Sequence, residues 1–357
     1  METLKFIAFN AVKVVVITHI LLGAVAYTVW LERKLIGRMQ NRWGPTRVGP
    51  FGLLQPIADG LKFIVKEDLL PPGVNKPLFL LAPLIAVVLA LTSLAVIPFG
   101  DVVTINGTKY PLEITDVNIG LLIILGATSI GVYGIALAGW SSNSKYSLLG
   151  SLRASAQMIS YELSLGLSLV GVLMMSSSLS LREIVGSQGG AIWGITGTAL
   201  SWNIFGGLQF IAFFVYMISA YAETNRIPFD LPEAETELVA GYHTEYSAMK
   251  FAMFFMAEYA NMFTAACVAT LLFLGGWLPP HPALMLGEPG SLAHVLSGVG
   301  WFVAKIFVFI FVYIWIRGTL PRFRYDQLMA FGWKYLLPIA IANIIFTGLA
   351  MSLGWRT

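Results

Sequence analysis

Cysteine is nearly absent from this chain, and histidine is scarce. The 357 residues include one cysteine, Cys267, and four histidines, His19, His243, His281 and His294. A single thiol excludes an intrachain disulfide and leaves too few thiolates for an iron–sulfur cluster. The histidines show no pairing at metal-ligand spacing. We therefore expect no metal, no iron–sulfur cluster and no covalently bound cofactor in this chain.

Charge is also scarce. Only 11% of the residues are charged and 57% are hydrophobic, whereas a soluble domain carries ~25% charged residues. The apolar runs reach the ~20 residues that cross a hydrocarbon core of ~30 Å. The alternating segments of ~10 residues typical of a membrane barrel are not evident. A net charge of +3 is too small to indicate binding to nucleic acid. The composition predicts an all-α, polytopic membrane protein with a single membrane domain over residues 1–357.

About eight transmembrane spans are expected from these runs. Their approximate ranges are 8–31, 77–99, 117–140, 158–179, 204–222, 250–276, 298–317 and 335–354. The first run is too long for a signal peptide and is followed by Glu32-Arg-Lys, so we expect it to remain as a span.

Positive charge is distributed unevenly between the two sides of these spans. Of the 22 lysines and arginines, about 16 lie in or beside the loops after the first, third, fifth and seventh spans. The positive-inside rule places those loops in the cytoplasm and both termini outside it. We expect the inner (plasma) membrane of a bacterium, because no organelle-targeting segment precedes the first span.

The longest cytoplasmic loop, residues 32–76, contains an expected interfacial helix. Apolar residues recur at helical spacing over 51–66, with Asp59, Lys62 and Lys66 set apart from them. A helix of this length is too short to span, so it lies at the membrane interface or against the bundle. From spacing alone, Asp59 and Lys62 form an ordinary i,i+3 ion pair.

A second cytoplasmic loop, residues 223–249, is rich in acids. Glu233, Glu235 and Glu237 alternate with other residues, so they share one face of an extended segment. Their mutual repulsion favours proton uptake, which a proton relay requires. The alternative is a solvated acidic loop.

Further ionisable groups lie at membrane depth. Glu162, Glu223, Glu258 and Glu32 fall within or at the ends of spans, where charge is costly and usually faces a wet interior. They line a hydrated path, or they pair with Arg33, Arg153 or Arg226 to fix helix ends. Lys305 lies about two turns inside the seventh span, where snorkelling and a role in proton transfer remain open alternatives.

Several long motifs give the chain a family resemblance. They are Glu32-Arg-Lys, Arg47-Val-Gly-Pro-Phe-Gly-Leu-Leu-Gln-Pro-Ile-Ala-Asp-Gly-Leu-Lys, Ser142-Asn-Ser-Lys-Tyr, Glu223-Thr-Asn-Arg-Ile-Pro-Phe-Asp-Leu-Pro-Glu-Ala-Glu-Thr-Glu-Leu and Pro321-Arg-Phe-Arg-Tyr-Asp. With these motifs, nearly the whole chain resembles the subunit 1 (H) family of respiratory complex I.

The resemblance implies a membrane subunit of the proton-translocating NADH:quinone oxidoreductase, with quinone as the substrate of the complex. Such a subunit forms the quinone-access chamber and an acidic path that couples quinone reduction to proton pumping. The implied partners are the peripheral-arm quinone-site and iron–sulfur subunits, small membrane subunits, antiporter-like pump subunits and membrane lipid. No catalytic residue of the redox step is expected in this chain.

The family's functional residues transfer to matching positions here. The implied proton path consists of Glu162, Glu223, Glu233, Glu235, Glu237 and Glu258. The implied lining of the quinone chamber consists of Arg33, Asp59, Lys62, Arg153 and Phe229. On this view the helix 51–66 is a wall of the chamber.

Three other functions compete with this one. One is a purely structural anchor, which predicts that mutations that remove charge are harmless. A membrane subunit of an energy-conserving hydrogenase has homologous residues but uses no quinone. A stand-alone proton or ion transporter also explains intramembrane acids, although transporters often contain two matching halves and no internal repeat is evident here.

Overall fold

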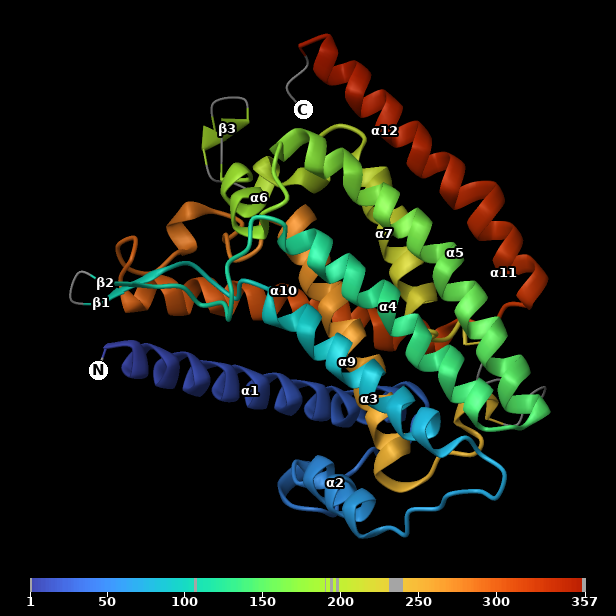
Figure 1. Ribbon diagram of the computed structural model, residues 1–357. Helices are drawn as coiled ribbons and strands as arrows, with labels where there is room; N and C mark the ends of the chain where they lie inside the picture. Colours follow the sequence, from blue (N-terminus) through green and yellow to red (C-terminus); the bar gives the residue numbers. More distant parts are fainter. Residues whose placement is uncertain are drawn as a thin grey trace.

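The structure is a computed structural model that describes residues 2–105, 108–189, 191–192, 195–196, 199–230 and 240–354. Most of this part is helical (Figure 1). The helices are α1 Glu2–Met39, α2 Gln55–Val65, α3 Lys76–Ala95, α4 Gly120–Ser141, α5 Lys145–Ser176, α6 Leu181–Ser187, α7 Gln209–Glu223, α9 Ala248–Phe273, α10 Leu292–Thr319, α11 Tyr325–Phe331 and α12 Leu337–Ser352. Two small antiparallel hairpins pair β1 Val103–Ile105 with β2 Thr108–Tyr110 and β3 Ala191–Ile192 with β4 Ile195–Thr196.

Within the described ranges, seven helical stretches are long and apolar enough to cross a membrane. These are α1, α3, α4, α5, α9, α10 and the stretch Tyr325–Ser352, in which α11 and α12 are joined by a π turn. The expected fifth span is α7, a shorter apolar helix of 15 residues. The all-α membrane fold is therefore confirmed. Several helices begin earlier than expected, and the difference is greatest for α5, which begins at Lys145, and for the last span, which begins at Tyr325.

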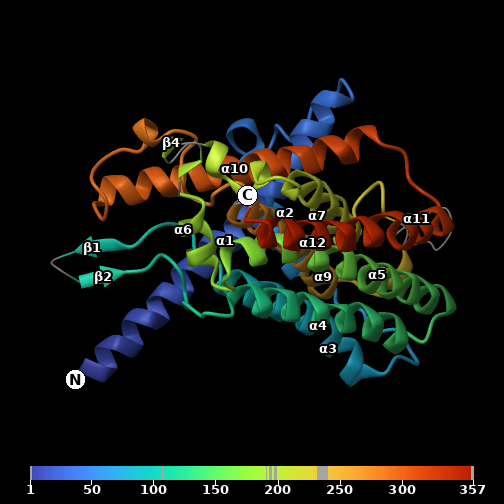
Figure 2. The same ribbon diagram turned by 90° about the horizontal axis from the view of Figure 1, so that it is seen from above.

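The long helices alternate in direction, so the bundle has two distinct ends. We call the end that carries the loop 40–54 and the segment 224–230 the loop end, and the end that carries β1–β2 and the segment 274–291 the hairpin end (Figures 1 and 2). Helices α3, α4, α5, α7 and α9 contact one another and form the main bundle, and α12 packs on α5.

Small residues let the central helices approach closely. A Cβ atom added to Gly139 of α4 would lie 2.0 Å from Ser151 Oγ and 2.6 Å from the Ser147 backbone oxygen of α5. Both serines are buried. This close contact is typical of membrane helices, which associate through small residues.

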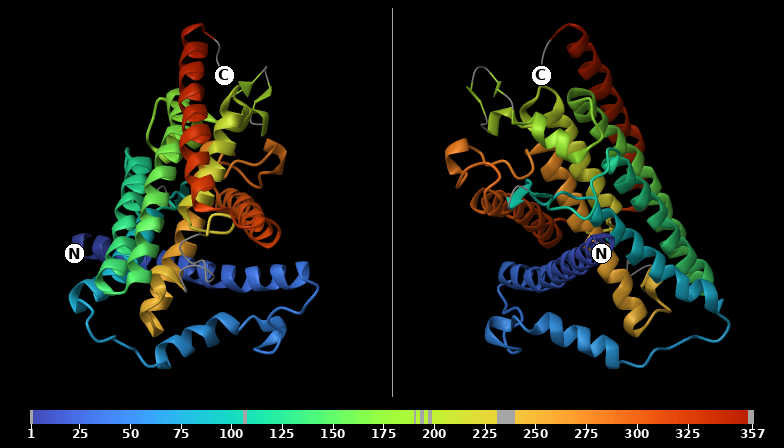
Figure 3. Two further views of the ribbon diagram at one scale, coloured as in Figure 1. Left: turned by 90° about the vertical axis from the view of Figure 1, so that its right-hand side faces the viewer. Right: turned by 60° about the vertical axis from the view of Figure 1, so that its left-hand side comes forward.

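Helices α1 and α2 are peripheral. Figure 3 shows α2 beside α1, away from the main bundle. It contacts α9 through Phe63 and Phe251, whose ring centroids are 6.3 Å apart. The apolar face of α2 is largely exposed, with Leu61 58% and Ile64 68% exposed, as expected of an amphipathic interfacial helix.

An ion cluster holds the hairpin end together. Arg182 of α6 bonds to Glu113 at 2.7 Å and lies 3.8 Å from Asp101. Burial raises the pKa of Glu113, although the charge of Arg182 opposes this shift. The cluster ties α6 to the segments that precede and follow the β1–β2 hairpin.

Candidate functional site

A large cavity lies at the loop end of the bundle. Its volume is about 1070 Å³, and it is open to the outside. We call it the loop-end cavity. It is lined by Val29, Glu32, Arg33, Ile36, Gln40, Arg42, Trp43, Gly44, Pro45, Thr46, Arg47, Gln55, Ile227, Phe255, Tyr259, Arg317 and Gly318. The lining combines apolar and aromatic walls with several charged groups, as ligand cavities commonly do.

Glycines allow the loop after α1 to fold back and form one wall of this cavity. A Cβ atom on Gly44 would lie 2.9 Å from Lys34 Cα, so the loop packs directly against the end of α1. Gly52 has a φ of 78°, and its Cβ would lie 2.3 Å from the Pro45 oxygen. The position requires glycine on both grounds, conformation and space.

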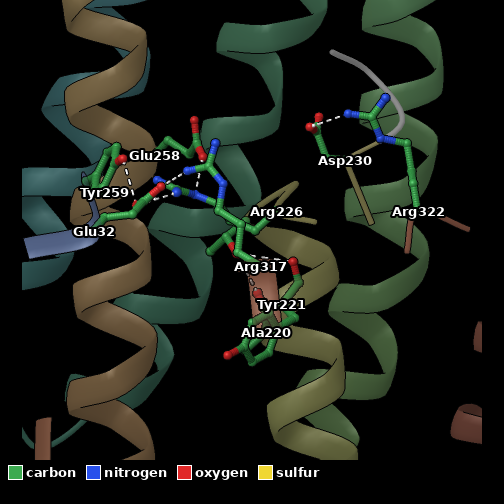
Figure 4. A network of polar contacts seen from close by, with 10 residues as sticks. Glu32, Ala220, Tyr221, Arg226, Asp230, Glu258, Tyr259, Arg317 and Arg322 are labelled. Atoms are coloured by element: carbon green, nitrogen blue, oxygen red, sulfur yellow. Dashed lines mark hydrogen bonds and ion pairs between the residues drawn. The ribbon is translucent and has the colours of Figure 1, made fainter. Parts of the chain in front are cut away.

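A buried ion cluster borders the loop-end cavity (Figure 4). Glu32 accepts a hydrogen bond from Arg226 at 2.9 Å, one from the Tyr259 hydroxyl at 2.9 Å, and one from Arg317. Arg226 also pairs through Nε with Glu258 at 2.5 Å, and its guanidinium lies 4.0 Å from the centre of the Tyr259 ring. Three transmembrane helices, α1, α9 and α10, and the segment after α7 meet in this cluster.

Three of the four charged side chains of this cluster are largely removed from water, and the fourth, Arg317, is 31% exposed. The side chains of Glu32 and Arg226 are 7% and 6% exposed, and that of Glu258 is 16% exposed. Two carboxylates and two guanidinium groups balance one another, which makes burial of the set tolerable. Removal of Arg226 breaks the ion pair of the buried Glu258 carboxylate, at a cost of about 3–5 kcal/mol.

A second, much smaller cavity lies on the other side of Glu258, and we call it the acid cavity. Its volume is about 40 Å³, and Glu223, Glu258, Asn225 and Asn261 line it. A contiguous space of about 30 Å³ shares Glu223 and Asn261. Since one water needs about 10–15 Å³ of such volume, these spaces have room for a few waters beside two carboxylates.

Glu162 adjoins this group. It accepts a hydrogen bond from Ser129 of α4, and it is close enough to Glu223 for the two charges to interact. Glu162, Glu223 and Glu258 therefore lie in one region, and the acid cavity lies between Glu223 and Glu258. Of the three, Glu258 is the one with an ion pair to an arginine within the described chain.

The residues expected to line the chamber fall into two groups. Arg33 lines the loop-end cavity and bonds to Asp59 at 2.8 Å, and Lys62 bonds to Asp59 at 3.1 Å. Burial alone would raise the pKa of Asp59, but the hydrogen bond from Lys62 and the charge of Arg33 outweigh it and lower that pKa. The expected i,i+3 pair is thus present, and Arg33 joins it.

Arg153 and Phe229 form the other group and do not line the loop-end cavity. The Arg153 guanidinium lies 5.8 Å from the Tyr325 ring centre. Phe229 is buried, with its ring centre 5.9 Å from that of Tyr161 and 5.7 Å from that of Phe323. In this chain the two residues lie by the segment that joins α10 to α11.

Three of the expected path residues, Glu233, Glu235 and Glu237, lie outside the described residues. Near them, Asp230 pairs with Arg322 at 3.1 Å (Figure 4). Among the described residues, no three His, Cys, Asp or Glu side chains lie close enough together to hold a metal ion.

The sequence offered Arg226 only as one possible partner of the buried acids, a pairing that the structure confirms, and it assigned no role to Arg317 or Tyr259. Each was visible as a polar residue at or near the end of an apolar run, the same signal that drew attention to Glu32. The sequence could not show that these residues meet, because α1, α9, α10 and the segment after α7 are brought together only by packing.

Comparison with known proteins gives a consistent result. A family model described as NADH dehydrogenase matches residues 12–348. The NADH-quinone oxidoreductase H-type subunit numbered 2 in Koribacter versatilis is 68% identical over 358 aligned positions, covering 98% of this chain and 98% of that protein. The H-type subunit numbered 1 in Solibacter usitatus is 50% identical, covering 99% and 98%. The one numbered 1 in Geobacter sulfurreducens is 53% identical, covering 96% and 94%.

Proposed function

The chain belongs to the NADH dehydrogenase family, with H-type subunits of NADH-quinone oxidoreductase among its relatives, and from this premise we propose that it forms the quinone-access chamber and an acidic proton path. The relatives' names favour this function over membership of a hydrogenase or the role of a free-standing transporter. The complex is the oxidoreductase, and this chain supplies binding and coupling rather than the redox centre.

The loop-end cavity is our candidate for the part of the chamber that this chain provides. A quinone has an apolar tail and a polar head, so its site needs apolar walls and a few charged groups. Val29, Ile36 and Phe255 supply apolar wall, while Arg33 and Arg317 supply charge. Through Arg33, the Asp59–Lys62 pair of α2 borders the same space. We place Arg153 and Phe229 at a more distant part of the chamber, completed by partner subunits.

The proton path in this proposal passes through Glu162, Glu223 and Glu258 and continues to Glu233, Glu235 and Glu237 of the acidic loop. The acid cavity supports Glu223 and Glu258, because it brings their carboxylates and space for water together, and Glu162 is close enough to Glu223 to interact with it. Ionisable groups at this depth are costly without such a role. The path would pass protons or charge changes to neighbouring membrane subunits.

One observation carries the proposal: Arg226 connects the two cavities. Glu32, which lines the loop-end cavity, and Glu258, which lines the acid cavity, both pair with this guanidinium. The two cavities share no lining residue. A change of charge in the chamber therefore has a route to the acidic path through Arg226, in a low-dielectric region where such effects are large.

The coupling follows from this arrangement. Quinone reduction takes up protons and changes the charge near Arg317 and Glu32. A more negative chamber draws Arg226 toward Glu32 and away from Glu258, and a carboxylate that loses its cation binds a proton more readily. Glu258 then takes up a proton from the acid cavity, and it releases the proton when Arg226 returns.

In this proposal the loop end faces the cytoplasm and both termini face the other side of a bacterial plasma membrane. The loops 32–76 and 223–249 then meet the peripheral-arm subunits that carry the iron–sulfur clusters. Small membrane subunits and antiporter-like subunits adjoin the remaining faces, with lipid between them.

The test is substitution of Glu162 or Glu258 by Gln in the assembled complex. Quinone reductase activity and proton pumping should fall together, because each substitution removes a titratable group from the path. Glu288→Gln, on the exposed segment at the hairpin end, is the matched control and should leave both unchanged. Normal pumping in both path variants, with normal assembly, would contradict the proposal.

A further inference from the structure

Lys305 of α10 lies in a cage of backbone carbonyl groups at the hairpin end. Its Nζ donates to the oxygens of Leu274 at 2.6 Å, Gly276 at 2.8 Å and Leu278 at 2.6 Å. The residue is 8% exposed, and the ammonium lies 4.1 Å from the centre of the Trp202 ring. Within the described part of the chain, no carboxylate lies within 4.0 Å of this group.

The cage closes the C-terminal end of α9. The last carbonyls of a helix have no partner within it, and the negative end of the helix dipole favours a cation. Preceding carbonyls are also bonded: Gln188 Nε2 donates to the Leu271 oxygen and Asn203 Nδ2 to the Leu272 oxygen, both at 2.7 Å. Side chains from three separate segments thus fix the end of α9.

Two glycines bring the carbonyls together. Gly275 and Gly276 have φ values of 68° and 54°, which let the chain curl around the ammonium. A Cβ atom on Gly275 would lie 2.5 Å from the Trp202 indole nitrogen. The backbone at Gly275 therefore packs closely against the indole, which also contacts the ammonium.

The arrangement does not suit a proton carrier. An ammonium has three donors, and each here faces a carbonyl oxygen, which does not take up a proton. Snorkelling is excluded too, because the side chain turns inward to α9 rather than to the surface.

Helix α9 transmits this attachment to the ion cluster. Glu258 precedes Leu274 by 16 positions, or about 24 Å along a helix. Helix α10 is fixed at its other end as well, because Arg317 bonds to Glu32. We propose that Lys305 is a positioning residue whose caged ammonium group sets the axial position of α9 against α10 and so holds Glu258 at Arg226. The consequence for activity rests on the function proposed above for Glu258.

Chemical rescue tests this proposal. In the assembled complex, Lys305→Ala should lower quinone-reductase turnover on the order of 10-fold with little change in the KM for quinone, since the loop-end cavity is remote. Its half-inactivation temperature should fall on the order of 5 °C. Added ethylammonium or ethylguanidinium should restore both, because either cation can fill the emptied cage. Lys305→Met, which fills the space with an apolar chain, should respond to neither.

Ethylguanidinium distinguishes a positioning role of Lys305 from a proton-carrying role, because a guanidinium keeps its charge at every accessible pH and cannot carry a proton. Rescue by ethylammonium alone, with a pH profile that follows the added amine, would identify a proton carrier and overturn the proposal. No rescue by either cation of an assembled complex would also overturn it. If Lys305→Ala does not assemble with either cation present, Lys305→Arg is the second test. An assembled and active Lys305→Arg complex supports the capping role, whereas a Lys305→Arg complex that does not assemble either refutes it. A further outcome separates the two proposals. If the cations restore the heat tolerance of Lys305→Ala, but Glu258→Gln changes neither quinone reduction nor proton pumping, the capping role of Lys305 stands and the proposed proton path fails.

Discussion

Arg226 offers the sharpest quantitative test of the buried cluster. In Arg226→Met, Glu258 loses its ion pair of 2.5 Å, whereas Glu32 keeps its bonds to Arg317 and Tyr259. The principal cost is therefore the loss of this ion pair from a buried carboxylate. Removal of one partner of a buried pair costs about 3–5 kcal/mol. The lower end, about 3 kcal/mol, applies here because Glu258 borders the acid cavity and is 16% exposed.

A double-mutant cycle isolates this interaction. Glu258→Gln alone should cost about 1 kcal/mol, because Arg226 keeps Glu32 as its partner. In the double variant no carboxylate is left unpaired, so the loss should be smaller than the sum of the single losses by about 1–2 kcal/mol. The assay is thermal unfolding of the purified complex, in which a loss of about 3 kcal/mol lowers the midpoint on the order of 5–10 °C.

Arg322→Met is the matched control, because it breaks the pair with Asp230 at 3.1 Å, in which the arginine side chain is 34% exposed. That loss should stay near 1 kcal/mol or below. Function should also be affected more by Arg226→Met than by Arg322→Met. Arg226→Met should lower the number of protons pumped per electron pair more than it lowers the rate of quinone reduction. Strict additivity in the cycle, or an unchanged pumping ratio, would refute the reasoning.

Two further predictions concern the packing and the interfacial helix. Gly139→Ala should destabilise the protein by about 1–3 kcal/mol in thermal unfolding, since its methyl group would overlap Ser151 and the α5 backbone. The control is Gly126→Ala on the same helix, where an added Cβ would have no atom within 4 Å, and it should be neutral or slightly stabilising. The Arg33–Asp59 link between α1 and α2 should persist at pH values above the usual aspartate pKa of about 3.9 and be lost as the pH falls through the lowered pKa of Asp59, because protonation removes the charge. Spin-label distances between α1 and α2, recorded as the pH is lowered, should show this loosening only in acid, and Asp59→Asn should show it at every pH. A wild-type distance that changes near neutral pH would contradict the assignment.

The sequence by itself determined the membrane class, the number of apolar runs and the residues worth inspecting. Long runs of apolar residues permit few structures, because in lipid every backbone polar group must be bonded within the chain. The motifs around Glu32, Arg47 and Glu223 were long enough to identify the family. The i,i+3 pair of Asp59 and Lys62 could also be predicted, since it depends on one turn of one helix.

Only the tertiary structure decided which of these charges meet. Glu32, Arg226 and Glu258 are far apart in the chain, and their pairing depends on how three helices and a connecting segment converge. The same holds for Lys305, whose position within an apolar run gave no indication that the carbonyls of a neighbouring helix end surround it. Helical periodicity fixes the face on which a side chain lies, but the partner across that face is set by packing between segments that are remote in sequence.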